Sequence, residues 1–198
     1  MIQLQDISNQ TPYLIFKEKY YEAINAGQKN IEAIAISSFN KKLNEVDSRF
    51  VNLKFINDVN FIFFSNYHSP KSKAFSSYNQ ISALFYWSST NTQIRMKAKI
   101  HKTSIKFNND YFQNRSIEKN ALAIASHQSS KIISYEDLFL EYKETIKNQN
   151  LTKCPDYWGG FSFAPYYFEF WEGHESRVNI RNVYEKKASK WKQFIIQP

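Results

Sequence analysis

The segment Thr92-Gln-Ile-Arg-Met-Lys-Ala-Lys-Ile-His101 alternates apolar and polar residues over almost its whole length. Successive side chains of an extended strand point to opposite faces, so this alternation predicts a strand with one apolar and one polar face. The apolar face carries Ile94, Met96, Ala98 and Ile100. The polar face, which is either solvated or turned toward a ligand, carries Gln93, Arg95, Lys97, Lys99 and His101.

Further runs rich in β-branched and aromatic residues predict strands on both sides of this segment. The predicted strand ranges are 31–38, 50–55, 59–65, 81–88, 92–105, 160–164, 167–172, 177–185 and 190–197. Many short strands favour a mainly β protein, with a closed or partly closed antiparallel barrel. Nothing in the composition marks a linker, so we expect a single domain over residues 1–198.

Helices are predicted as additions to this barrel. The first spans about 12–26, with Thr11 as its cap and Gly27 at its end. A second begins at Ser69-Pro70 and lies between two strands. Two more are predicted near 116–126 and 134–150, within a helical insert at about 109–150, and Ser134 is spaced from Asp137 as in a capping box.

The composition excludes several classes of protein. Hydrophobic residues are 42% and aromatic residues 17%, which is too much apolar material for a disordered chain. The 4 Gly and 5 Pro exclude collagen-like and linker-like classes. No apolar run approaches the roughly 20 residues that cross a bilayer, and the N-terminal residues do not resemble a signal peptide. We therefore expect no membrane association. Cys154 is the only cysteine, so no internal disulfide is possible and we expect a cytoplasmic protein.

The charge balance indicates an anionic partner. The formal net charge is +8, and only five of the 26 cationic residues are arginine: Arg49, Arg95, Arg115, Arg177 and Arg181. Arginine offers a planar fork that suits a phosphate or an aromatic ring, although each could equally be a solvated surface cation. On the strand predicted at 177–185, Arg177, Asn179 and Arg181 would face one way. Lys71, in the first turn of the helix that begins at Ser69-Pro70, would add a cation where free amides favour phosphate.

Other chemistries lack support in the sequence. There is no G-x-G-x-x-G or Walker-type loop for a dinucleotide or ATP, and no G-x-S-x-G elbow for a nucleophile. The four histidines show no metal-ligand spacing, so no metal is expected. The aromatic residues fall inside apolar strand runs and are expected in the core, which argues against a nucleic-acid partner. The residues alone therefore predict a β-barrel that binds a small phosphorylated ligand.

Nine short segments of the chain, taken together, carry a resemblance to a known family. They are Arg49-Phe-Val-Asn-Leu-Lys54, Phe64-Ser-Asn66, Ser69-Pro-Lys71, Gln93-Ile-Arg95, Tyr111-Phe-Gln-Asn-Arg115, Gln128-Ser129, Trp158-Gly-Gly160, Glu169-Phe-Trp171 and Arg177-Val-Asn-Ile-Arg181. In order and spacing they resemble the pyridoxamine 5′-phosphate oxidase family, flavoproteins with the FMN-binding split-barrel fold. The resemblance runs from about residue 12 to the C-terminus.

The resemblance implies roles for individual residues. It implies that FMN contacts Arg49, Val51, Leu53, Phe64, Ser65, Lys71, Gln93, Gln128, Ser129, Trp171 and Arg181, with Lys71 on the FMN phosphate. It implies that the substrate contacts Lys54, Tyr111, Arg115, Lys119, Arg177 and Asn179. Of these, Arg177 would position the substrate ring for reaction at the flavin. The family builds each FMN site from two subunits, so a homodimer with FMN at the interface is implied.

The sequence also departs from the family pattern. Asn179 stands where the family has a substrate-contacting histidine, and Ile180 where it has an aspartate. Pro70 replaces an arginine beside the FMN phosphate, and Lys119 falls where a serine contacts the substrate. Asn179 can still hydrogen-bond but cannot carry charge near neutral pH. The flavin site therefore looks intact by resemblance, while the substrate site is altered.

These observations predict an FMN-dependent oxidase that converts pyridoxamine or pyridoxine 5′-phosphate to pyridoxal 5′-phosphate, with O2 as acceptor and H2O2 as product. The altered residues leave two alternatives open. One is a related split-barrel flavoprotein with another substrate, such as a phenazine-pathway-type oxidase. The other is a flavin-binding protein without this activity.

Overall fold

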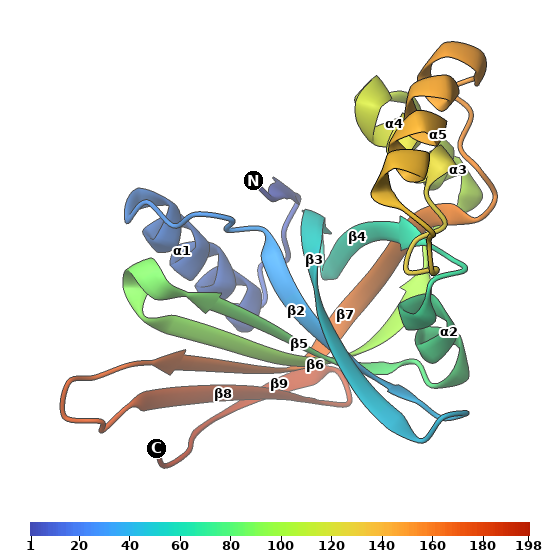
Figure 1. Ribbon diagram of the computed structural model, residues 1–198. Helices are drawn as coiled ribbons and strands as arrows, with labels where there is room; N and C mark the ends of the chain where they lie inside the picture. Colours follow the sequence, from blue (N-terminus) through green and yellow to red (C-terminus); the bar gives the residue numbers. More distant parts are fainter.

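A computed structural model describes all residues, 1–198, and shows a nine-stranded sheet that curls into a barrel (Figure 1). The strands are β1 (Gln3–Gln5), β2 (Ala33–Asn40), β3 (Glu45–Asn57), β4 (Asn60–Asn66), β5 (Gln80–Trp87), β6 (Thr92–Lys102), β7 (Trp158–Glu172), β8 (Ile180–Lys187) and β9 (Lys190–Ile195). The sheet order is β1-β3-β2-β5-β6-β7-β8-β9, and β4 pairs with both β3 and β7. Strands β2 to β7 therefore form a closed ring, which confirms the predicted barrel.

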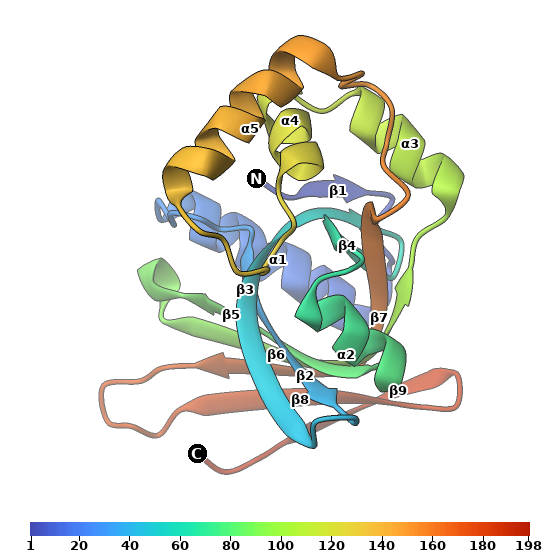
Figure 2. The same ribbon diagram turned by 45° about the vertical axis from the view of Figure 1, so that its right-hand side comes forward.

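The helices lie around this barrel, which agrees with the prediction of helical additions. They are α1 (Thr11–Asn25), α2 (Pro70–Ser77), the short 3-10 helix η1 (Ser88–Thr90), α3 (Ile105–Gln113), α4 (Ile117–Ala125) and α5 (Tyr135–Asn148). Figure 2 shows α3, α4 and α5 gathered above the barrel, with α2 beside β4 and the β8–β9 hairpin at the opposite end. No helix combines the length and apolar character needed to cross a membrane.

The core is dominated by aromatic rings that strands and α1 contribute together. Phe16 of α1 is fully buried, and its ring centroid lies 5.2 Å from that of Phe61 and 5.6 Å from that of Phe85. Strand β6 adds Ile94 and Met96, which are both fully buried. The predicted alternation of β6 is confirmed, because its apolar face lies in this core and its polar face is exposed or half-buried.

Several predicted boundaries are wrong. The N-cap of α1 is Gln10 rather than Thr11, with Pro12 in the first turn. The strand predicted at 92–105 ends at Lys102, because the Ser104 hydroxyl accepts the Phe107 amide and begins α3. The strands predicted at 160–164 and 167–172 are one strand, β7, whose pairing with β6 shifts register near Pro165. Strand β1 was not predicted, and α3 begins at Ile105, before the helical insert predicted at about 109–150.

The predicted strand at 177–185 also begins too early. Strand β8 starts at Ile180, while Arg177 adopts a left-handed φ of 60° in a turn. The Arg177 amide donates to the His174 carbonyl at 2.9 Å, and the His174 amide donates to Asn179 Oδ1 at 3.1 Å. Arg177, Asn179 and Arg181 therefore do not share one face of a strand, as the alternation had predicted.

Removing the Phe16 ring should destabilise the protein strongly. Phe16→Ala empties a fully buried site between α1 and the barrel, which typically costs about 3–5 kcal/mol of unfolding free energy. Urea denaturation followed by tryptophan fluorescence measures this loss. Leu14→Ala on the same helix is the control: Leu14 is 44% exposed, so its loss should cost less than about 1 kcal/mol. Equal losses in both variants would contradict this packing.

Candidate functional site

A cavity of about 520 Å³ lies between the barrel and the helices of the insert. Strands β3 and β4 and the start of β7 form one side, and α2, α3, α4 and the segments that follow α3 and α4 contribute the rest. Its lining is Phe50, Val51, Asn52, Lys54, Phe64, Ser65, Asn66, Lys71, Tyr111, Arg115, Lys119, Leu122, Ala123, Ser126, Gln128 and Trp158. Four of these residues are cations and none is a carboxylate, so the cavity is suited to an anion.

Lys71 is the most buried of the four cations. Its ammonium donates to Ser65 Oγ at 3.1 Å, to Ser69 Oγ at 3.2 Å and to Gln128 Oε1 at 3.0 Å. Burial, and then the positive charge of Arg49, lower the pKa of Lys71 to about 8. None of its hydrogen-bond partners carries a charge, so Lys71 is a desolvated cation without a counter-ion among them.

The local sequence explains why Lys71 faces the cavity. Pro70 occupies the first turn of α2, where its missing amide leaves no intrahelical bond unmade. Ser69 is the N-cap residue as predicted, yet its hydroxyl does not cap an amide and instead donates to the Asn66 carbonyl at 2.7 Å. The first turn of α2 is thereby held against the end of β4, next to Ser65.

The other three cations of the cavity, Lys54, Arg115 and Lys119, form a second group. Burial lowers the pKa of Lys54, Glu32 opposes that shift, and the charges of Lys119 and Arg115 lower the pKa further. Arg115 Nη1 donates to the Lys119 carbonyl at 2.9 Å, which ties the start of α4 to the end of α3. Three cations this close together repel one another, so an anion bound among them would be favoured.

Aromatic rings stack along one wall of the cavity. The Phe64 and Tyr111 rings are 3.8 Å apart at 13°, and the Phe64 and Trp158 rings are 5.1 Å apart at 11°. The Arg115 guanidinium lies 4.9 Å from the centre of the Trp158 ring. Stacked rings of this kind offer a flat apolar surface beside the cations, as a planar aromatic ligand with an anionic group requires.

Trp158, Phe50 and Asn52 also line the cavity but received no role from the sequence. Trp158 opens the Trp158-Gly-Gly160 string, and Gly159 explains part of it. A side chain at Gly159 would collide with the Tyr67 hydroxyl and the Asn108 amide. The string therefore marks a close approach of β7 to its neighbours, which sets Trp158 at the cavity wall.

The remaining predicted residues of this region lie outside the lining. Arg49 donates to the Ile36 carbonyl, to Ser38 Oγ and to Asp47, although it lies near enough to Lys71 to influence its pKa. The Leu53 side chain is fully buried in the core, so its backbone is the part that could meet a ligand. Ser129 is exposed with a left-handed φ of 68° beside Gln128.

A second set of predicted residues forms one row on the sheet. In the strand register Gln93 of β6 lies opposite Trp171 of β7, and Trp171 lies opposite Arg181 of β8. Cross-strand partners share a face, so the three side chains stand side by side. Arg177 is exposed in the turn that precedes β8.

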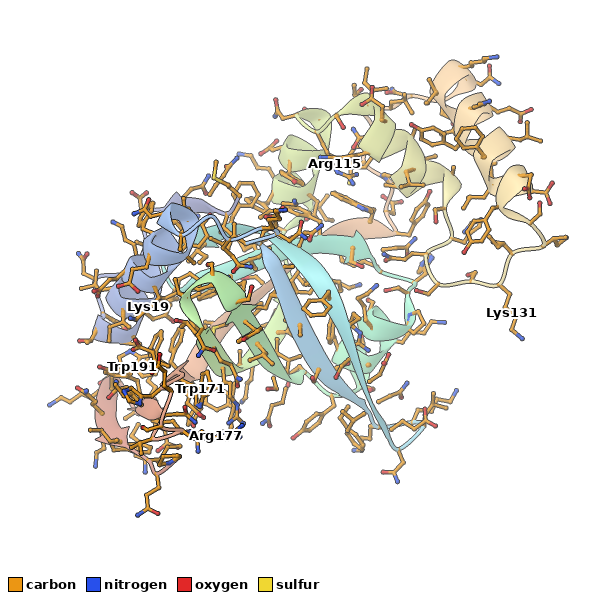
Figure 3. All side chains as sticks on the ribbon, turned by 60° about the vertical axis from the view of Figure 1, so that its left-hand side comes forward. Lys19, Arg115, Lys131, Trp171, Arg177 and Trp191 are labelled. Atoms are coloured by element: carbon orange, nitrogen blue, oxygen red, sulfur yellow. The ribbon has the colours of Figure 1, made fainter.

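One chain does not bring the two sets of residues together. Figure 3 shows Arg115 among the helices of the insert and Trp171 with Arg177 at the other end of the molecule. The cavity residues and the row of Gln93, Trp171 and Arg181 therefore cannot meet around one ligand within a single chain.

Comparisons with known proteins point to one family. Residues 158–198 match the model of the pyridoxine 5′-phosphate oxidase C-terminal dimerisation region. The chain is 34% identical to pyridoxine/pyridoxamine 5′-phosphate oxidase of Colwellia psychrerythraea, over 96% of this chain and 88% of that protein. It is 33% identical to the enzyme of the same name from Coxiella burnetii, over 92% of this chain and 93% of that protein.

Solved structures show the same barrel. PhzG from Burkholderia lata 383, in complex with tetrahydrophenazine-1-carboxylic acid, has a TM-score of 0.89 at 25% identity and covers 94% of this chain and 92% of its own. A pyridoxamine 5′-phosphate oxidase-related, FMN-binding protein from Nostoc punctiforme has a TM-score of 0.75 at 12% identity, over 92% of this chain and 97% of its own. The fold is thus that of the split β-barrels related to pyridoxamine 5′-phosphate oxidase.

The sequence relatives narrow the class further. Because the chain shares about a third of its residues with these enzymes over almost its full length, it belongs to the pyridoxine/pyridoxamine 5′-phosphate oxidase family. Members of this family are FMN-binding flavoproteins.

Anion binding in the cavity should depend on pH through Lys71. Sulfate stays a dianion across the neutral and alkaline range, so a change in its affinity reports on the protein. With a Lys71 pKa of about 8, sulfate should bind well near neutrality and weaken above pH 8 by up to about tenfold per pH unit as the ammonium loses its proton. Isothermal titration calorimetry at several pH values measures this.

The matched variants are Lys71→Met and Lys73→Met, since Lys73 is an exposed lysine of the same helix. Lys71→Met should bind sulfate weakly and lose the decline that begins near pH 8. Lys73→Met should behave as the wild type. An unchanged pH profile in Lys71→Met would show that another group titrates.

Proposed function

We propose that this chain is an FMN-dependent oxidase that converts pyridoxamine or pyridoxine 5′-phosphate to pyridoxal 5′-phosphate, with O2 as acceptor and H2O2 as product. The single observation that carries the proposal is the cavity with four cations, no carboxylate and a wall of stacked rings. Both ligands of such a reaction join a flat aromatic ring to a phosphate. Family membership supports the same assignment.

The residues present fit FMN. Lys71, with Ser65 and Gln128 around its ammonium, would hold the FMN phosphate at the start of α2. Binding a dianion there would give the buried ammonium the counter-ion that its present partners do not supply. The further residues that we assign to FMN are Arg49, Val51, the Leu53 backbone, Phe64, Gln93, Ser129, Trp171 and Arg181. When bound, FMN would supply the redox chemistry by accepting a hydride from the exocyclic carbon of the substrate and passing electrons to O2.

The substrate phosphate would be held by the second group of cations. Lys54, Arg115 and Lys119 line one cavity with Tyr111, and they leave several N–H donors free for phosphate oxygens. Lys119 would compensate with a charge for the hydroxyl that the family has at this position. The role of these residues is to place the substrate ring at reacting distance and to exclude alternative orientations.

A second copy of the chain would complete each site. Trp171, Arg177, Asn179 and Arg181 all lie within the segment that matches a dimerisation region. A two-fold dimer repeats every contact, so the C-terminal residues of each chain could face the cavity of the other. Arg177 would then act on the substrate ring from the partner's side, with Asn179 beside it. We place the reaction in the cytoplasm, in keeping with the single cysteine.

A second candidate function is favoured by the structural match to PhzG at a TM-score of 0.89. In that case the same barrel and flavin site would act on a phenazine-type substrate that carries a carboxylate. Asn179 and Ile180, which depart from the family pattern, support this candidate, whereas the three cations around Lys54 support a phosphate. A chain that binds flavin without turnover is the remaining alternative.

The oxidase reaction and its phosphate specificity can be tested together. Purified wild type should be yellow, release FMN on denaturation and form H2O2 with pyridoxamine 5′-phosphate. Arg115→Ala should stay yellow but raise KM strongly, because it removes a charge-assisted hydrogen bond to the substrate phosphate and leaves the residues assigned to FMN unchanged. A yellow wild type that yields no peroxide, and whose flavin spectrum does not change on adding pyridoxamine 5′-phosphate, would favour the phenazine-type candidate.

A complementation experiment tests the shared site. Arg115→Ala and Arg177→Ala would each impair both sites of a homodimer, since each removes one contact from each site. A heterodimer purified through two different tags carries both changes in one site and neither in the other. It should therefore recover about half of the wild-type kcat/KM, as expected for a two-fold dimer with one intact site. Activity no higher than that of the two homodimers would show that one chain builds its site alone.

A further inference from the structure

Glu169 of β7 is a carboxylate buried at the polar face of the sheet. It is 1% exposed, although the strands around it carry exposed lysines on that face. It lies two residues from Trp171 and therefore faces the same way, and its register partner on β6 is Arg95. The carboxylate thus stands directly beside the row of Gln93, Trp171 and Arg181.

The two oxygens of Glu169 are fully used within the chain. Oε1 accepts from Arg181 Nε at 2.9 Å and from Arg181 Nη2 at 2.6 Å. Oε2 accepts from Arg95 Nη1 at 3.0 Å and from the Tyr167 hydroxyl at 3.0 Å. A carboxylate offers about four acceptor positions, so none is left for a ligand. Glu169 can therefore act only through the groups that it holds.

These bonds fix the direction of Arg181. Its guanidinium has five N–H donors, of which Glu169 takes two and the Gln197 carbonyl takes one at 2.9 Å. The two donors that remain are one on each terminal nitrogen, so they point away from Glu169. Arg95 uses one donor on Glu169, and its side chain is 46% exposed.

We propose that Glu169 is a positioning residue that sets both the orientation of Arg181 and the net charge that the Arg95–Arg181 pair presents to bound flavin. This inference rests on the proposed function, in which Gln93, Trp171 and Arg181 contact FMN. Two arginines and one carboxylate leave a net charge of +1 beside the flavin, held in a fixed geometry by the hydrogen bonds around the buried carboxylate.

The charges of Glu169, Arg95 and Arg181 should influence the midpoint potential of bound FMN, which packing alone would not do. Reduction adds negative charge to a flavin, so a more positive surrounding favours the reduced form. Glu169→Gln removes the carboxylate charge and leaves two arginines uncompensated, which should make the midpoint potential of bound FMN more positive. Arg95→Gln removes one cation at a half-exposed position and should make that potential more negative.

The experiment compares purified wild type with Glu169→Gln, Arg95→Gln and the control Glu185→Gln, each loaded with FMN. Glu185 lies opposite Tyr167 in the register, four residues after Arg181, and pairs with the exposed Lys187. Spectroelectrochemical titration gives the midpoint potential, and fluorescence quenching gives the FMN affinity. Glu169→Gln should also bind FMN roughly tenfold more weakly, the scale on which supporting partners act at ligand sites. Glu185→Gln should match the wild type in both measurements.

Opposite shifts of potential in Glu169→Gln and Arg95→Gln would support the proposal. A purely structural bridge would lower thermal stability and leave the potential of both variants unchanged, which would overturn it. If Glu169→Gln does not fold, Arg95→Gln decides alone, since an unchanged potential there refutes the electrostatic role. If the wild type takes up no FMN, the proposed function itself is overturned. If the wild type binds FMN and the variants have the same midpoint potential and FMN affinity, only this inference is overturned.

Discussion

The pairing of β4 with β3 on one edge and β7 on the other is the constraint on which the rest of the structure depends. It closes the sheet into a ring and fixes the register on both edges, with Phe63 opposite Leu53 and Phe64 opposite Gly160. Because side chains alternate along a strand, Phe63 is fully buried in the core while Phe64 stacks on Tyr111 at the cavity wall. Strand β4 therefore divides core from site.

The cavity gathers charge at a cost that an anion would relieve. Burial and neighbouring cations lower the pKa of both Lys54 and Lys71, so the protein without an anion holds these ammonium groups in an unfavourable environment. An ionised phosphate would supply the missing counter-charge and raise both pKa values again. The same physics explains why no carboxylate lines the cavity, since one placed there would compete with the ligand.

Patterns that repeat along the chain could be predicted from the sequence, whereas contacts between distant segments could not. The alternation of β6 identified its buried face because burial follows the two-residue period directly. Arginine is much less frequent than lysine in this sequence, and this contrast drew attention to Arg115, which lines the cavity, and to Arg181, which lies in the row with Gln93 and Trp171. By contrast, the turn at Arg177 depends on two hydrogen bonds of the His174 backbone, one accepted from Arg177 and one donated to Asn179, that no alternation reveals. The burial of Glu169 depends likewise on three strands meeting in one register, which composition does not encode.

That turn also changes what Asn179 can do. Its Oδ1 accepts the His174 amide at 3.1 Å, so one of the two lone pairs of this oxygen is committed to closing the turn. The two N–H donors of the amide and the second lone pair of Oδ1 remain for a ligand. Under the proposed function an N–H of Asn179 would donate to an acceptor on the substrate ring, and the phenolic oxygen of a pyridoxine-type ring is such an acceptor. A histidine at this position could carry a proton to the substrate as well as donate a hydrogen bond. Under the proposed function the asparagine would thus keep a hydrogen bond to the ring, and the side chain at this position would carry no titratable group.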